Sequence, residues 1–266
     1  MGLNSQMPKR LQDVDLTATL SKEESERRVL EAQRHLLHLR LFTGGLLEAD
    51  QVGPGILVLM EGWDAAGKGG AIKRIVTPID ARHVKVASFG KPTPREFRHH
   101  FLWRFFPDIP GHGGMSIFDR TWYGRVLVER VEGFCEPKAW KRAYGEINAI
   151  EESLAAEGVT IVKFFLHLSE EEQLRRFEAR RSDPLKGWKL TDEDWRNRNK
   201  REDYEEAIND MLAKTDTEGA PWQVIAGDSK RFSRVAVLEA LNAEIERGIR
   251  SFGMEPPASK GLDYGI

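Results

Sequence analysis

The residues that could do chemistry are concentrated in a glycine-rich segment, residues 61–70, which reads EGWDAAGKGG. A continuous apolar run at residues 56–60, typical of a strand buried on both faces, comes directly before it. Glycines let the backbone turn tightly and point its N–H groups at phosphate oxygens, and a following helix adds positive potential. Lys68 supplies a mobile positive charge for a transferring phosphoryl group. The segment therefore predicts a phosphate-binding loop. The predicted backbone contacts come from Gly62, Ala65, Ala66, Gly67, Gly69 and Gly70.

This loop differs from the common phosphate loop at two positions. Gly69 follows Lys68, where a Ser or Thr hydroxyl usually binds magnesium. Asp64 places a carboxylate among amides that face phosphate, and the two anions would repel each other unless a metal ion lay between them. We interpret Asp64 as a magnesium ligand or as the group that positions the attacking phosphate. An aspartate that only structures the loop is the alternative.

A second carboxylate, Asp119, ends the apolar run at residues 115–118. In open α/β sheets ligands bind outside the carboxyl ends of the strands, where this side chain would emerge. Arg120 follows at once, in position to contact a phosphate or to pair with Asp119; an ordinary surface arginine is the alternative. The sequence thus predicts a Mg²⁺ site formed by Asp64 and Asp119. The predicted catalytic residues are Asp64, Lys68, Asp119 and Arg120.

A strongly basic segment at residues 174–201 follows an apolar run at residues 159–166. In phosphate-loop kinases this position usually holds a lid whose arginines close over the donor. The alternative is a solvated basic face, but few acids lie nearby to pair with it, and Trp188 stands among the cations. The lid cations predicted to bind phosphate are Arg176, Arg180, Arg181, Lys186 and Lys189.

The remaining pattern is an alternation of short apolar runs with helical stretches, which predicts a three-layer α/β/α sandwich with a mostly parallel sheet and a helical lid. Residues 1–50 form an N-terminal extension with one helix, capped by Ser21 with Glu24 three residues later. Residues 51–266 form the phosphotransferase domain, with the lid at about 174–201. Strands are expected at residues 56–60, 84–88, 115–118, 159–166 and 222–225. Helices are expected at residues 21–41, 68–79, 94–106, 122–131, 137–157, 169–181, 191–213 and 231–250.

The composition fits a cytoplasmic enzyme. The chain has 266 residues, a formal net charge of −2 and a single cysteine, Cys135, which rules out an intrachain disulfide framework. The first 20 residues lack the apolar stretch of a signal peptide, and no apolar run is long enough to span a membrane. We expect a cytoplasmic protein with no membrane partner and no nucleic-acid partner. We find no His/Cys metal cluster and no nucleophilic triad in the sequence.

With these residues in view, the chain resembles the polyphosphate kinase type 2 family, a P-loop kinase family related to thymidylate kinase. The likeness covers nearly everything from residue 53 to residue 250. It rests on four segments, at residues 62–70, 118–123, 183–189 and 215–222. Polyphosphate has no base or ribose to bind, only repeated charge, so a track of Lys and Arg agrees with this donor.

The resemblance implies transfer of the terminal phosphoryl group of polyphosphate to a nucleoside mono- or diphosphate, AMP/ADP or GMP/GDP. It implies a magnesium requirement and usually a homodimer or homotetramer. It assigns Asp64 and Asp119 to metal and catalysis, Lys68 to phosphate, and Arg120 with the lid cations to the phosphate chain. Gly124 stands where subgroups of the family differ, so the acceptor class stays open. The residues predicted for the nucleotide acceptor are Lys73, Lys91, Arg104 and Trp122, with ordinary surface cations as the alternative for the first three.

Two other functions compete with this interpretation. An ATP-dependent nucleoside monophosphate kinase of the thymidylate type shares the fold and loop, but it would be expected to carry Ser or Thr after Lys68. A non-catalytic polyphosphate-binding module would gain nothing from carboxylates at positions 64 and 119 beside the phosphate.

Overall fold

The fold is built on one sheet of five strands, seen in a computed structural model that describes residues 10–47 and 51–258. The strand order is β2-β3-β1-β4-β5, and every neighbouring pair is parallel. The five strands occupy the predicted positions, so these predictions are confirmed. The strands are β1 (Gly55–Gly62), β2 (Lys85–Ser88), β3 (Met115–Asp119), β4 (Val159–His167) and β5 (Trp222–Ala226).

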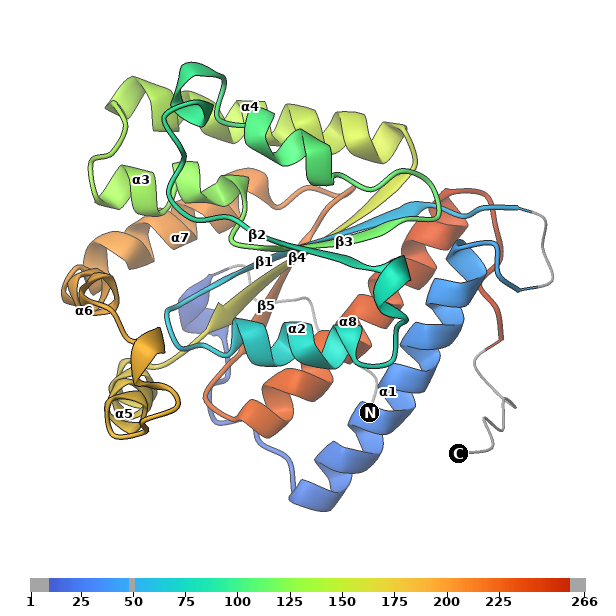
Figure 1. Cartoon of the computed structure of the whole chain (residues 1–266), viewed down its shortest axis with the longest axis horizontal. Helices are drawn as coiled ribbons and strands as arrows, with labels where there is room; N and C mark the ends of the chain where they lie inside the picture. Colours follow the sequence, from blue (N-terminus) through green and yellow to red (C-terminus); the bar gives the residue numbers. More distant parts are fainter. Residues whose placement is uncertain (1–9, 48–50, 259–266) are drawn as a thin grey trace.

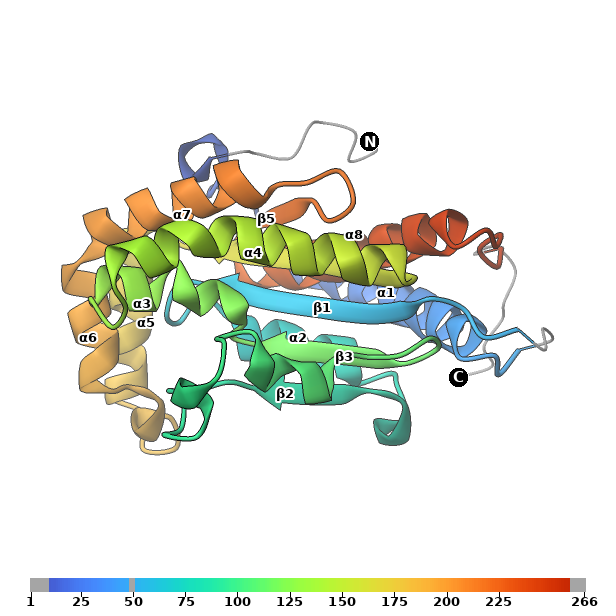
Figure 2. The same cartoon turned by 90° about the horizontal axis from the view of Figure 1, so that it is seen from above.

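Helices cover both faces of the sheet. α3, α4 and α7 lie over one face, and α1, α2 and α8 lie over the other (Figures 1 and 2). The predicted three-layer α/β/α sandwich is therefore confirmed, with a sheet that is parallel throughout. The helices are α1 (Lys22–Thr43), α2 (Lys68–Val76), α3 (Val128–Val131), α4 (Pro137–Ala156), α5 (Glu170–Arg181), α6 (Asp192–Asn199), α7 (Arg201–Thr215) and α8 (Lys230–Ser251).

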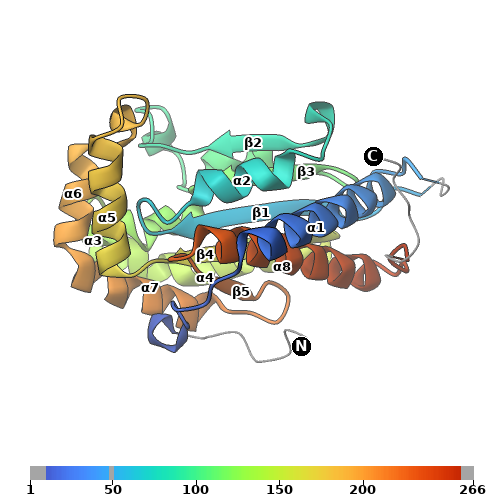
Figure 3. The same cartoon turned by 90° about the horizontal axis from the view of Figure 1, so that it is seen from below.

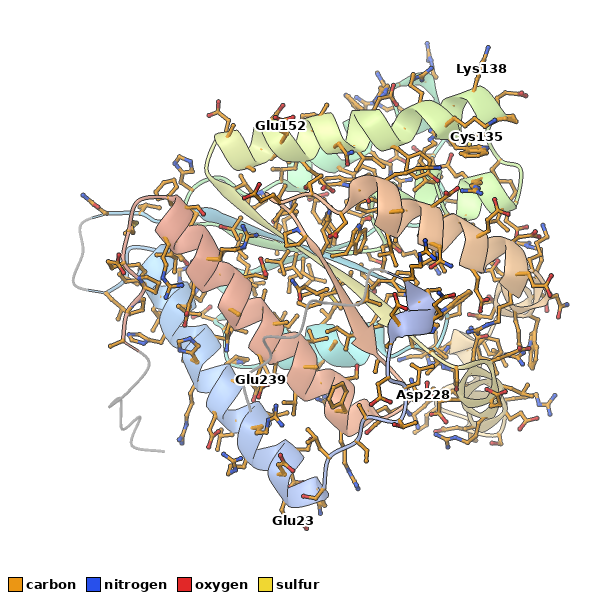
Figure 4. The ribbon with its side chains drawn as sticks, turned by 180° about the vertical axis from the view of Figure 1, so that it is seen from behind. Glu23, Cys135, Lys138, Glu152, Asp228 and Glu239 are labelled. Atoms are coloured by element: carbon orange, nitrogen blue, oxygen red, sulfur yellow. The ribbon has the colours of Figure 1, made fainter. Side chains whose placement is uncertain are left out.

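The N-terminal helix α1 is part of this sandwich. The Ser21 hydroxyl accepts a hydrogen bond from the Glu24 N–H at 3.1 Å, which confirms the predicted N-cap. α1 runs beside α8, and Arg28 of α1 pairs with Glu239 of α8 at 2.7 Å (Figure 4). α1 and α8 therefore form one layer on the sheet, while the domain boundary at residue 50 stays a prediction.

Three helix predictions are wrong. Residues 122–131 form a 3-10 helix, Trp122–Arg125, and the short α3, because the backbone of Leu127 between them (φ −106°, ψ −97°) is not helical. Residues 94–106 contain two short 3-10 helices, Glu96–Arg98 and Trp103–Asp108, instead of one α-helix. His99 between them has an extended backbone (φ −114°, ψ 168°), and Pro107 in the second has no N–H to continue a helical ladder. The stretch predicted at 191–213 is two helices, α6 and α7, because Lys200 (φ −107°, ψ 27°) interrupts the helical backbone.

The lid lies at the carboxyl ends of the strands, where the phosphate loop leaves β1. It consists of α5, a connecting turn and α6, which form a separate stack at this end of the sheet (Figure 3). Within residues 10–47 and 51–258, none of the helices combines the length and the apolar character that crossing a membrane requires.

Candidate active site

The phosphate loop connects β1 to α2, and its backbone conformation explains its glycines. Gly62 has φ 144°, and a Cβ there would lie 2.6 Å from the carbonyl oxygen of Leu166. Gly67, the residue before α2, has φ 109°. Ala65 between them has φ 64°, a conformation that costs a non-glycine residue about 1–3 kcal/mol. The loop thus turns tightly into the N-terminus of α2, as the sequence predicts.

Lys68 is the first residue of α2 and folds back over the loop. Its Nζ donates hydrogen bonds to the carbonyl oxygens of Gly62 and Trp63. Both acceptors belong to the phosphate loop itself. Glu61, at the end of β1, lies close enough for the Lys68 charge to act on its carboxyl group. Burial raises the pKa of Glu61, while the Lys68 charge and hydrogen bonds from Thr121 act in the opposite direction.

Glu61 connects the loop to the turn that follows β3, a role the sequence analysis missed. One of its carboxylate oxygens accepts both the Thr121 N–H and the Thr121 hydroxyl, each at 2.8 Å. Arg120, one residue earlier, is exposed and has φ 65°, a strained backbone for a non-glycine residue. Asp119 ends β3 in register with Met60 of β1. Asp119 and Arg120 therefore emerge beside the phosphate loop, as predicted.

Asp64 is held by the lid. Its Oδ2 accepts a hydrogen bond from Asn197 of α6 at 2.9 Å, and its backbone carbonyl accepts one from Gln173 of α5 at 3.1 Å. Asn197 in turn accepts the hydroxyl of Tyr204 at 3.1 Å. The lid as described thus lies directly on the loop.

A pocket opens on this side of the loop, and we call it the loop pocket. Apolar and aromatic side chains from α3, β4 and α7 line it together with the charged residues of the site. Gly124 also lines it, and a Cβ there would meet only Val128 at 3.8 Å, so the space beyond is open. The lining residues are Glu61, Gly62, Trp63, Asp64, Lys68, Arg120, Gly124, Leu127, Val128, Phe165, Gln173, Glu193, Asn197, Tyr204 and Ile208.

A second recess, the cationic groove, opens on the other side of the loop between α5 and the start of α8. Of its thirteen lining residues, seven are Lys or Arg and none is Asp or Glu. Its lining residues are Ala65, Ala66, Gly67, Gly70, Arg175, Arg176, Ala179, Arg180, Lys186, Lys189, Lys230, Ser233 and Arg234. Arg180, Lys186 and Lys189 were predicted from the sequence, whereas exposed Arg181 does not line the groove.

Lys230 and Arg234 of α8 were missed by the sequence analysis. Burial lowers the pKa of both side chains, and the nearby positive charge of Arg176 adds to the effect. The sequence could have indicated this site, because Lys230 and Arg231 begin a helix whose first turn contains no acidic residue. Cations at a helix N-terminus add to the positive end of the helix dipole, and this combination favours the binding of an anion.

Arg176 lies beneath the groove and differs from the other lid cations. Its side chain is only 4% exposed, and all five N–H groups have partners inside the protein. The partners are Glu172, the carbonyl oxygens of Ala65 and Ala66 in the loop, and the carbonyl oxygens of Gly227 and Asp228 at 2.6–3.1 Å. Asp228 lies where the chain passes from β5 to α8 (Figure 4). The structure thus places Arg176 as a brace between α5, the loop and the β5–α8 connection, and leaves it no donor for phosphate.

The residues predicted for the acceptor do not come together. Lys73 and Lys91 are exposed and line neither recess. Arg104 is engaged within its own segment, where it donates to the Gly90 carbonyl at 3.1 Å and lies 5.4 Å from the Phe89 ring centroid. Trp122 is 1% exposed, and its indole N–H donates to Glu151 at 3.0 Å. Trp122 therefore belongs to the core and has no face free to stack on a base.

The carboxylates of the site fit a magnesium ion only if substrate supplies further ligands. Within the described ranges, no group of three or more His, Cys, Asp or Glu side chains is arranged to hold a metal. Magnesium is usually bound by one or two carboxylates together with substrate phosphates and water. Asp64 and Asp119 beside a phosphate loop fit that donor set.

A family comparison connects this geometry to known proteins. The family model described as Polyphosphate kinase 2 (PPK2) matches residues 19–251. The chain belongs to the polyphosphate kinase 2 family. The solved structure of a putative polyphosphate kinase 2 from Pseudomonas aeruginosa superimposes with a TM-score of 0.84 and 42% identity, over 90% of this chain and 51% of that chain. Polyphosphate kinase 2 from Arthrobacter aurescens gives 0.83 and 31%, over 100% of this chain and 92% of that one.

Several relatives of this chain are named for an activity. The polyphosphate:AMP phosphotransferase of Pseudomonas syringae is 45% identical over 89% of this chain and 46% of its own length. The enzyme of the same name from Pseudomonas aeruginosa is 48% identical over 72% of this chain and 38% of its own length. ADP-polyphosphate phosphotransferase 3 of Rhizobium meliloti is 39% identical over 76% of this chain and 69% of its own length. This chain thus spans less than half the length of the two AMP-named relatives.

Proposed function

We propose that this protein transfers the terminal phosphoryl group of polyphosphate to a nucleotide. The observation that carries the proposal is that two chemically different recesses meet at one phosphate loop. The cationic groove is lined by seven Lys or Arg side chains and by no aromatic side chain on which a base could stack. The loop pocket offers apolar and aromatic walls together with a few polar groups, which is the usual character of a site for an organic ligand.

The cationic groove suits a donor that consists only of phosphate. Besides burial, the charge of Arg176 lowers the pKa of Lys230 and Arg234, while Glu172 opposes this effect at Lys230, so bound phosphate would relieve the mutual repulsion of these cations. A long polyanion contacts many such cations at once and releases its counterions as it binds. ATP would place a base and ribose along a surface that has little to bind them.

The acceptor that we propose for the loop pocket is AMP. The apolar side chains of the pocket can pack against a base, and Glu193 can hydrogen-bond to its edge or to the ribose. Two relatives named for AMP align with most of this chain, which supports a monophosphate acceptor. Gly124 leaves open space next to the pocket.

The chemistry needs no covalent enzyme intermediate. An oxygen of the acceptor phosphate forms a bond to the terminal phosphorus of polyphosphate, the bridging P–O bond breaks, and the chain leaves one unit shorter. Lys68 and Arg120 offset the negative charge of the moving group, while the loop amides hold it in line. When bound, Mg²⁺ held by Asp64 and Asp119 would neutralise charge on the phosphate oxygens. A homodimer or homotetramer in the reducing cytoplasm stays a prediction.

The first experiment measures initial rates with polyphosphate or ATP as donor and AMP, ADP, GMP or GDP as acceptor, with products resolved. We expect turnover with polyphosphate and AMP, and little with ATP. Turnover with ATP alone would favour the ATP-dependent kinase, and binding without turnover would favour a binding module.

The second experiment tests the groove. Replacing Lys230 and Arg234 together by Ala should raise the KM for long-chain polyphosphate and reduce the slope of log affinity against log salt by about 1.5, from 0.7–0.9 per phosphate contact. The KM for AMP should change little. Lys138→Ala removes an exposed cation from α4, on another side of the molecule (Figure 4), and should change neither the slope nor either KM. Equal slopes in all variants would contradict the donor assignment.

A further inference from the structure

The side chain of Asn197 links the lid to the loop. Asn197 belongs to α6, and its Nδ2 donates to Oδ2 of Asp64 across the loop pocket at 2.9 Å. Within the part of the chain that the structure describes, Oδ1 of Asp64 has no hydrogen-bond partner. One oxygen of this carboxylate is thus bound by the lid, and the other remains for substrate or metal.

Asp64 and Tyr204 together fix which way the Asn197 amide faces. An ionised carboxylate can only accept, so the NH₂ group of Asn197 faces Asp64. Oδ1 of Asn197 then faces Tyr204, whose hydroxyl donates to it at 3.1 Å. Tyr204 itself is buried and packs edge-on against Trp63, with ring centroids 6.3 Å apart.

Ion pairs to the body of the protein keep α6 in this place. Glu132, at the end of α3, has a side chain that is 4% exposed and accepts from Arg196 at 2.8 Å and from Lys200 at 3.2 Å. Both cations flank Asn197 along α6 and its exit. The amide therefore approaches Asp64 from a helix that is anchored to the end of α3 and not to the loop.

We propose that Asn197 is a positioning residue, carried by the lid, that orients the Asp64 carboxylate for phosphoryl transfer. This inference rests on the proposed function, because it gives Asp64 the metal-binding or phosphate-positioning role. It also means that the site is complete only when α6 lies on the loop, so that an open lid leaves Asp64 without its partner. Asn197 touches the reacting groups only through Asp64.

The test compares two substitutions that add the same charge to the same helix. Asn197→Asp is nearly isosteric but replaces a donor by a carboxylate facing Asp64. Asn199→Asp adds its charge at an exposed position two residues away. We expect Asn197→Asp to lower kcat about 10- to 100-fold and raise the Mg²⁺ requirement, with the KM for polyphosphate within about twofold of wild type. Asn199→Asp should leave kcat, the Mg²⁺ requirement and the KM for polyphosphate unchanged. Tyr204→Phe should lower kcat several-fold, because the Asn197 amide loses a hydrogen bond that holds its orientation.

Hydrogen exchange gives a readout that does not depend on activity. Without substrate, Asn197→Asp should increase exchange in residues 62–70 and 192–199, because the two carboxylates repel each other and the lid lifts. Asn199→Asp should not. This comparison remains valid if wild type fails to phosphorylate AMP from polyphosphate, an outcome that refutes the proposed function alone.

Two results would overturn the inference. One is an Asn197→Asp enzyme with wild-type kcat and wild-type exchange. The other is an equal loss in the Asn197 and Asn199 variants, which would assign the effect to charge on α6 alone. If Asn197→Asp does not fold, Asn197→Ala takes its place, and a kcat unchanged from wild type would again refute the role.

Discussion

Replacement of Arg176 by Met should destabilise the whole protein, because this side chain is a brace and not a phosphate ligand. The change removes five donors at once. Four backbone carbonyls lose the Arg176 partner, and Glu172 keeps only Arg175. Unsatisfied buried groups cost about 1–3 kcal/mol each, so a loss of about 3–5 kcal/mol is a conservative expectation. At about 2–4 °C per kcal/mol for a chain of this size, Tm should fall by about 6–20 °C.

The matched control is Arg180→Met, one helical turn further along α5. Arg180 lines the cationic groove and is only half-buried, so its loss should shift Tm by no more than about 2 °C but raise the KM for polyphosphate. Arg176→Lys should retain most of the instability, because an ammonium group supplies three donors and no planar fork. The test measures Tm and the KM for polyphosphate in all three variants, and it distinguishes a structural brace from a phosphate ligand. Equal Tm values with an equal rise in KM would refute the brace and restore Arg176 as a phosphate ligand.

Three further predictions follow from the site. Lys68→Ala should lower kcat about 10²- to 10³-fold while Tm stays near that of wild type, by analogy with loss of one preorganised donor; near-native turnover would contradict its role. Gly124→Glu should fold, since a Cβ there meets only Val128, but should raise the KM for AMP more than that for polyphosphate; an unchanged ratio of the two would place the acceptor elsewhere. Burial lowers the pKa of His167 to about 4. Between pH 6.5 and 4 this side chain is therefore neutral in the folded protein but protonated in the unfolded chain. Stability should thus fall by about 3 kcal/mol between pH 6.5 and 4, a loss that urea unfolding would show and that His167→Gln should reduce.

The strands and the loop were predictable because their signals are local. A buried parallel strand reads as an apolar run, and the glycines before Lys68 have few other uses at the end of such a run. The same holds for Asp119, which ends its strand where the sheet order places it next to β1. The split between α6 and α7 was missed, because Lys200 has no intrinsic tendency to end a helix and its contacts with Glu132 are made across the fold.

The roles of single cations were not predictable in the same way. Arg176 and Arg180 are four residues apart and share one helix face, so spacing alone gives them the same role. The difference arises because the loop and the β5–α8 connection bring four carbonyl oxygens to Arg176 and none to Arg180. Lys230, Arg234 and Asn197 reach the loop from more than 100 residues away. Only the tertiary fold makes them neighbours.

The segment at residues 215–222, which helps to define the family likeness, lines neither the loop pocket nor the cationic groove. It contacts the site through buried residues. Lys163 in β4 is fully buried and donates to Glu151 at 2.8 Å, to the Thr215 carbonyl at 2.6 Å and to the Tyr123 hydroxyl at 3.1 Å. Glu151 also accepts the Trp122 N–H and the Tyr123 hydroxyl. These bonds fasten the turn directly after Arg120, whose φ of 65° costs about 1–3 kcal/mol and needs such support. The buried charges thus help to hold Arg120 toward the loop, although none of them approaches substrate.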